Sequence, residues 1–204
     1  MKIKNLLLFL SASLIAAFAF ISFSCTCSSC SQQEEIDVPV ELLKKANDFI
    51  ISKTGKEIFD SYVSPDFVLT KKTGSTYEMA YRFMMPEKPF VDELIHFTVD
   101  STGRVIKERE VFGIPECLSN PSLCVFNIDE EKARSIAKEL GLEQGVIDWK
   151  VGFLWDETLK QYVWHVLNTL YESEGSNGYI GNGKEIVIDP NTGLVLKEND
   201  WKIR

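Results

Sequence analysis

Two stretches of the sequence follow one pattern, and this repetition limits the folds that the chain can adopt. Residues 95–108 and residues 185–198 each begin with alternating apolar residues, reach an Asp, turn through Thr-Gly, and continue with Val, an aliphatic residue, Lys and Glu. The Asp can accept hydrogen bonds from turn amides, while Gly103 and Gly193 can take the positive φ that closes a short hairpin. We expect two similar β-hairpins, and we favour turn formation over calcium binding because each turn offers too few carboxylates.

A predicted helix and two predicted strands precede the second hairpin. Asp129 is a good N-cap and Gly141 a good stop signal for a helix with one apolar face. Apolar residues then alternate on both sides of a turn at Asp156, which predicts two strands. The apolar residues are Ala133, Ile136, Ala137 and Leu140 in the helix, Trp149, Val151, Phe153 and Trp155 in the first strand, and Tyr162, Trp164 and Val166 in the second.

The first half of the chain contains matching elements. A helical apolar face ends near Gly55, and two strands are expected before the hairpin. The apolar residues are Leu42, Leu43, Ala46, Phe49 and Ile50 in the helix, Phe67 and Leu69 in the first strand, and Tyr77, Met79, Tyr81 and Phe83 in the second. The predicted fold class is therefore α+β, with two tandem helix-plus-four-stranded antiparallel sheet repeats at residues 37–112 and 128–204. Because a repeat of about 75 residues has a marginal core alone, we expect the repeats to pack together or share one sheet.

The second repeat resembles a PepSY domain over roughly residues 127–199. The resemblance lies in the helix at residues 128–137, the strand at 162–166 and the closing hairpin at 186–196; the first repeat matches mainly at residues 97–105. It implies a cystatin-like fold, with a helix on a sheet. PepSY domains occur in metallopeptidase propeptides and exported bacterial proteins, where a peptidase-inhibiting or chaperone-like role has been proposed. The tandem plan is also similar to β-lactamase inhibitor proteins, which grip an enzyme with a concave sheet. The motif implies no catalytic residues.

The N-terminus predicts export and a lipid anchor. Two early lysines precede an apolar run over residues 6–23, which is the plan of a secretory signal. Ser-Phe-Ser-Cys at residues 22–25 resembles the lipobox of bacterial lipoproteins. This resemblance implies a signal peptide at 1–24 and lipidation of Cys25, with Cys27 or Cys30 as alternatives. An uncleaved signal anchor is the other interpretation, since about 18 apolar residues can just span a bilayer. Residues 25–36 are small and polar and are expected to form a flexible tether.

Two further cysteines flank a turn signal. Cys117 and Cys124 lie on either side of Asn120-Pro121, and a disulfide between them is the natural interpretation in an oxidising compartment. It would close a linker at residues 113–127. A metal site at these thiols is the weaker alternative, because neither histidine is near them in sequence.

Catalytic motifs are absent from the sequence: there is no His-Glu-x-x-His, no Gly-x-Ser-x-Gly and no Walker loop. His96 and His165, the only histidines, are expected on strand faces opposite the large apolar residues, where solvent exposure is favoured over metal binding or proton transfer. Trp201 does not fit the repeat pattern and is a candidate for an exposed anchor or a wedge between the repeats. The glycine-rich segment from Glu172 to Lys184 is predicted to be a mobile inserted loop. We predict no catalytic residue, no metal site and no cofactor.

These features predict a non-enzymatic lipoprotein of the cell envelope, anchored on the periplasmic side or the outer surface. Its expected partner is another exported protein, a peptidase or other enzyme. The formal net charge of −8 argues against nucleic acid as a partner. The alternative is a lipoprotein that binds glycans or small molecules through exposed Trp and Tyr side chains. An enzyme built on His96 and His165 is a third hypothesis, and it requires the two rings to lie close together.

Overall fold

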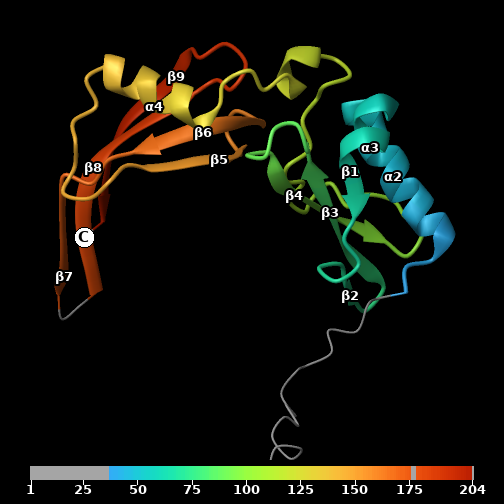
Figure 1. Cartoon of the computed structure of the whole chain (residues 1–204). Coiled ribbons are helices and arrows are strands. Elements are labelled where there is room, and N and C mark those ends of the chain that lie inside the picture. Colours follow the sequence, from blue (N-terminus) through green and yellow to red (C-terminus); the bar gives the residue numbers. More distant parts are fainter. Residues whose placement is uncertain (1–36, 176–177, 204) are drawn as a thin grey trace, which may run out of the picture. The chain divides into compact units, whose positions relative to one another are not determined.

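The computed structural model describes residues 37–175 and 178–203, and this part of the chain is an α+β protein (Figure 1). It contains three α-helices and two separate antiparallel sheets of four and five strands, which confirms that the chain is of the α+β class. The predicted signal peptide at 1–24, the lipidation of Cys25 and the tether at 25–36 lie outside the described residues. Within those residues, the helices are too short or too polar to span a membrane.

The first half begins with two helices. In α2 (Val40–Thr54) the buried residues Leu42, Ala46 and Ile50 recur every four positions and form one face. Gly55, with a φ of 84°, ends this helix as the sequence predicts. A short helix that the sequence did not predict, α3 (Lys56–Tyr62), follows directly.

The first sheet is centred on β3. β4 pairs with one side of β3 along its full length, and β1 and β2 pair with the other side in succession. The strands are β1 (Val63–Pro65), β2 (Lys71–Thr73), β3 (Thr76–Met84) and β4 (Asp92–Asp100). The predicted strand around Phe67 and Leu69 is wrong, because these residues lie in the turn between β1 and β2. The Asp66 carboxylate accepts hydrogen bonds from the amides of Val68 and Leu69, which stabilises a turn instead of a strand.

One face of the first sheet packs against α2, and the alternation predicted for β3 and β4 is confirmed. The buried residues on this face are Tyr77, Met79, Tyr81, Phe83, Ile95, Phe97 and Val99. The Tyr81 hydroxyl donates a hydrogen bond to Asn47 of α2 at 2.8 Å, and the rings of Phe97 and Phe49 lie 5.0 Å apart. The intervening residues of β3 and β4 therefore lie on the opposite face, away from the helix.

The turn of the first predicted hairpin forms as expected. The Asp100 carboxylate accepts hydrogen bonds from the Thr102 hydroxyl and from the amides of Thr102 and Arg104. Gly103 takes a φ of 80°. The Thr102 hydroxyl, followed by the Arg104 amide, holds the pKa of Asp100 well below its ordinary value.

The strand predicted over residues 104–108 is wrong. After the turn, the chain pairs with β4 only through isolated bridges at Val105 and Phe112. Residues 107–110 are Lys-Glu-Arg-Glu, and they offer no apolar side chain to bury against the sheet. Residues 107–111, here called the 107–111 loop, leave the sheet between the two bridges.

The second half follows the predicted order at its start. Its helix is α4 (Glu130–Glu139), where the Asp129 side chain caps the N-terminus through the Lys132 amide at 2.8 Å. The strands are β5 (Lys150–Asp156), β6 (Gln161–Leu167), β7 (Tyr171–Gly175), β8 (Gly178–Ile188) and β9 (Val195–Ile203). In this sheet β5 pairs with β6, β6 with β8, and β8 with β9. β7 pairs with the same edge of β8 as β6 does, but with the earlier residues of that strand.

The prediction of a mobile loop from Glu172 to Lys184 is wrong for the described residues, which form β7 and part of β8. A glycine is required within this segment. Gly183 pairs with Trp201 of β9, and a Cβ at Gly183 would overlap the carbonyl oxygen of Asn168. That oxygen accepts a hydrogen bond from the Trp201 indole at 2.9 Å. Gly183 is therefore required by the close approach of the connection between β6 and β7 to β8, and it does not mark a loop.

The segment between the two sheets contributes to one continuous core. It contains the 3-10 helix η1 (Pro121–Cys124). The Cα atoms of Cys117 and Cys124 lie 5.7 Å apart and the thiols are joined, so the predicted pair does come together at disulfide distance. Phe126 packs between the halves, with its ring 6.2 Å from that of Phe83 and 5.0 Å from that of Phe153.

Candidate functional site

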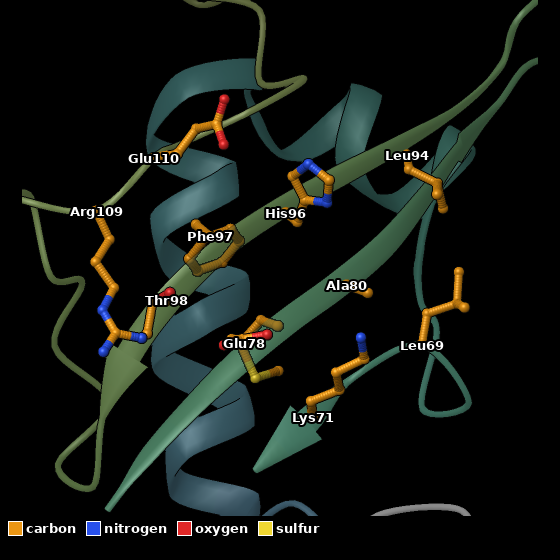
Figure 2. Close-up of a pocket in the computed structure, with 11 residues that line it drawn as sticks. Leu69, Lys71, Glu78, Ala80, Leu94, His96, Phe97, Thr98, Arg109 and Glu110 are labelled. Atoms are coloured by element: carbon orange, nitrogen blue, oxygen red, sulfur yellow. The ribbon is translucent and has the colours of Figure 1, made fainter. Parts of the chain in front are cut away.

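The face of the first sheet away from α2 contains a groove of about 530 Å³, which we call the open groove (Figure 2). Its floor is formed by β3 and β4. Ala80 and Thr98 are only 5% and 6% exposed although no helix covers them in the described ranges, because the walls of the groove shield them. The lining residues are Leu69, Lys71, Glu78, Met79, Ala80, Leu94, His96, Phe97, Thr98, Arg109 and Glu110.

One wall comes from the turn between β1 and β2. Figure 2 shows Leu69 and Lys71 on this side of the groove. The turn is fixed at both ends: the Thr70 hydroxyl accepts a hydrogen bond from the Ala80 amide at 3.1 Å, and Asp66 forms an ion pair with Arg82 at 3.4 Å. Arg82 also pairs with Asp92 at 3.0 Å. This wall is therefore attached directly to the central strand.

The opposite wall comes from the 107–111 loop, which places Arg109 and Glu110 at the other side of the groove (Figure 2). The loop is held by the backbone hydrogen bonds of its two flanking bridges. The Ile106 amide donates to Thr98 at 2.9 Å, and His96 and Phe112 exchange hydrogen bonds of 3.1 and 2.8 Å. The loop thus places the oppositely charged side chains of Arg109 and Glu110 beside the small side chains that form the floor of the groove.

The charge of the groove is mixed. Lys71 and Arg109 contribute positive charge, and Glu78 and Glu110 contribute negative charge. Leu69 and Leu94 add apolar surface. Such a lining suits a polypeptide segment that carries both charged and apolar side chains.

The two histidines have separate environments. His96 lines the open groove, and its exposed ring lies 4.7 Å from that of Phe112. His165 lies in β6, where Nδ1 pairs with the Glu185 carboxylate and Nε2 is buried without a hydrogen-bond partner in the described ranges. Both histidines lie on the predicted faces, but His165 is largely buried, so its expected solvent exposure is wrong. Residues 37–175 and 178–203 contain no group of three or more potential metal ligands.

The remaining predicted residues have structural environments. Trp201 lies in β9, and its indole is committed to the Asn168 carbonyl oxygen. Cys117 and Cys124 are buried and paired. Cys25 lies outside the described residues.

The corresponding face of the second sheet is filled by its own side chains. Lys197 of β9 forms an ion pair with Asp156 of β5 at 2.8 Å, and the pair of His165 and Glu185 lies on the same face. Burial opposes ionisation of Asp156, but hydrogen bonds from Lys197 and Thr158 outweigh it and hold its pKa well below the ordinary value. In the first sheet, by contrast, the face away from α2 is open as a groove.

Sequence reasoning did not identify the open groove. The available signal was the second set of alternating positions in β3 and β4, where Glu78, Ala80, His96 and Thr98 are small or polar. Leu69 in one wall belongs to a segment that was predicted to be a strand, and Arg109 and Glu110 in the other wall directly follow one. The comparison with known proteins adds no family to this description, since no family model and no curated protein matches the chain.

Proposed function

We propose that this protein is a non-enzymatic lipoprotein of the cell envelope that binds another exported protein, a peptidase or other enzyme, at the open groove. The observation that carries the proposal is the uncovered face of β3 and β4, with its mixed charge and shielded small residues. The mechanism is surface occlusion: the groove holds a segment of the partner and prevents that segment from meeting its own substrate. No bond is made or broken.

We further propose that the two halves are copies of one PepSY-like, cystatin-like unit. Support comes from the strand order, since a helix precedes β1-β3-β4 in the first half and β5-β6-β8 in the second. The closing turns also share their hydrogen bonds. Asp189 accepts from the amide and hydroxyl of Thr192, as Asp100 does from Thr102. Gly193 and Gly103 both have positive φ, of 76° and 80°.

The difference between the two sheets favours the first as the binding surface. In the second sheet, the side chains on the face away from α4 are bonded to one another through Asp156, Lys197, His165 and Glu185. A partner would have to break those contacts before binding there, which costs free energy. In the first sheet, the side chains of Lys71, Glu78 and Arg109 form no ion pair within the described ranges and can meet a partner directly.

Site-specific photocrosslinking tests the proposal in intact cells of the producing organism. A photoreactive phenylalanine analogue replaces Leu94 in the groove, and the matched control replaces Leu154, a partly exposed leucine of β5 on the other sheet. We expect a discrete protein adduct from position 94 and none from position 154. Ala80→Arg, which fills the floor of the groove, should abolish the adduct while circular dichroism stays unchanged. Absence of an adduct at position 94, or equal adducts at both positions, would contradict the proposal.

The lipoprotein part of the proposal has its own test. Cells that express the chain are given a labelled palmitate analogue. Cys25→Ser is expected to abolish label incorporation, and Cys27→Ser and Cys30→Ser are expected to leave it intact. Label that persists in Cys25→Ser would assign the modification to another cysteine, and absence of label from the unmutated chain would favour an uncleaved anchor.

A further inference from the structure

A second cavity, of about 450 Å³, lies on the other side of the 107–111 loop. Residues from both halves of the chain line it. α2 contributes Phe49 and Lys53, β5 contributes Trp155, and Lys160 comes from the turn between β5 and β6. Its volume falls within the range of small-molecule sites in proteins, about 300–1,000 Å³. The proposed protein-binding function does not use this cavity.

The inner surface of the cavity is apolar. It is formed by Phe49, Val105, Val111, Ile114 and Trp155. Trp155 is 5% exposed, and its indole Nε1 has no hydrogen-bond acceptor within the described ranges. A buried donor without an acceptor is uncommon in folded proteins and costs about 1–3 kcal/mol. Trp155, which lines the cavity, therefore also carries an unsatisfied N–H group.

Positive charge surrounds this apolar surface. Four cationic side chains line the cavity, namely Lys53, Lys107, Arg109 and Lys160, against the carboxylates of Glu110 and Glu116. Lys53 pairs with Glu116 at 2.6 Å, and Lys160 pairs with Glu157 outside the lining at 2.5 Å. The side chains of Lys107 and Arg109 make no ion pair or hydrogen bond within residues 37–175 and 178–203. This local excess of positive charge stands out in a chain whose formal net charge is −8.

We propose that the second cavity binds a small amphipathic carboxylate, a molecule with one carboxylate group on an apolar body. The apolar body would cover Phe49, Val111 and Trp155, and removing their surface from water supplies the main driving force. The carboxylate would lie at the rim, where Lys107 and Arg109 neutralise it. An arginine can hold a carboxylate by two parallel hydrogen bonds, so Arg109 also orients the ligand. A simple inorganic anion would leave the apolar surface wet, and a neutral apolar molecule would leave the cations unpaired.

Three ligands that share an apolar body and differ in charge test this inference. 4-Phenylbutyrate, 4-phenylbutanol and 4-phenylbutylamine are titrated by calorimetry into the full chain, which is held in lipid nanodiscs because its N-terminal segment is apolar. Empty nanodiscs provide the blank. We expect saturable binding of the carboxylate, at least tenfold weaker binding of the alcohol, and no binding of the amine. Equal affinity for the acid and the alcohol, or no binding of the acid, would overturn the proposal.

Paired variants locate the ligand. Lys107→Gln/Lys160→Gln removes two charges that line the second cavity but not the open groove, and it should weaken 4-phenylbutyrate binding about tenfold. The matched control, Lys132→Gln/Lys138→Gln, removes two exposed charges of α4 and should change the affinity less than twofold. Val111→Phe fills the cavity and should abolish binding, while the photocrosslink from position 94 persists. Equal weakening by both double variants would show that net charge alone attracts the ligand and would refute the site.

Discussion

Glu93→Gln is expected to remove a pH dependence from the stability of the protein. Glu93 lies in β4 on the same face as Ile95 and Phe97, pairs with Phe83 of β3, and is half-buried. Burial, with the adjacent charge of Asp92, raises the pKa of Glu93 from 4.5 to about 7. The folded protein therefore holds this proton more tightly than the unfolded chain does.

The sign and size of the effect follow from that shift. The contribution of Glu93 to stability is fully present below pH 4.5 and is lost as the pH rises through about 7. At about 1.4 kcal/mol for each pKa unit, the full shift corresponds to about 3 kcal/mol, and partial exposure to solvent reduces this to about 1–2 kcal/mol. Since Gln stays neutral, Glu93→Gln should be more stable than the wild type at pH 8, with a Tm higher by about 2–6 °C.

The assay is thermal unfolding followed by circular dichroism at pH 5 and pH 8. Glu78→Gln, an exposed substitution on the neighbouring strand, controls for the loss of one negative charge. The difference in Tm between Glu93→Gln and the wild type should be larger at pH 8 than at pH 5, and Glu78→Gln should show no such change. Parallel pH profiles for the wild type and Glu93→Gln would refute the reasoning.

Three further predictions concern stability, each measured by unfolding in guanidinium chloride or by heat. Gly113→Ala should destabilise the protein by about 2 kcal/mol or more, because Gly113 has a φ of 76° and a Cβ there would overlap the Leu94 carbonyl oxygen; a change below about 0.5 kcal/mol would contradict this. Reduction of the Cys117–Cys124 disulfide should lower stability by on the order of 2 kcal/mol, whereas the double Ser variant should not respond to the reductant. Asp129→Ala removes the cap of α4 and should cost about 1 kcal/mol, while Asp129→Asn, which keeps an acceptor, should cost much less.

The sequence predicted the elements whose apolar residues follow a single period. α2, β3, β4, α4, β5 and β6 each have long apolar faces, and burial of those faces decides both the element and its orientation. The cap at Asp129 and the turn at Asp100 were also predictable. In both, a carboxylate oxygen lies next to backbone amides that have no other acceptor, and it accepts their hydrogen bonds.

The errors occur where a local polar contact or a tertiary contact overrides the pattern. Apolar residues at 67 and 69 suggested a strand, but the Asp66 carboxylate binds two following amides and fixes a turn. Glycines in β8 suggested a loop, although Gly183 allows Asn168 and Trp201 to approach each other. Neither partner is adjacent in sequence, so no reading of the segment alone could reveal the contact.

The open groove was not predictable for a related reason. Its floor is formed by the alternate residues of β3 and β4 that face away from α2. Its walls are segments that do not form regular strands. The turn containing Leu69 and the 107–111 loop containing Arg109 both leave the sheet edge, one on each side. Had residues 104–108 paired fully with β4, Arg109 would lie along the strand and neither the wall of the groove nor that of the second cavity would exist.

The 107–111 loop connects the two proposals physically, because Arg109 and Glu110 line both the open groove and the second cavity. An arginine side chain that binds a carboxylate in the cavity is withdrawn from the wall of the groove, so the two ligands compete for one cation. Such competition is reciprocal: a partner that holds Arg109 in the groove must weaken carboxylate binding by the same factor. The run of charged residues that prevents a strand at residues 107–110 therefore supplies lining residues to both sites. Arg109 is the residue through which the two sites would be coupled.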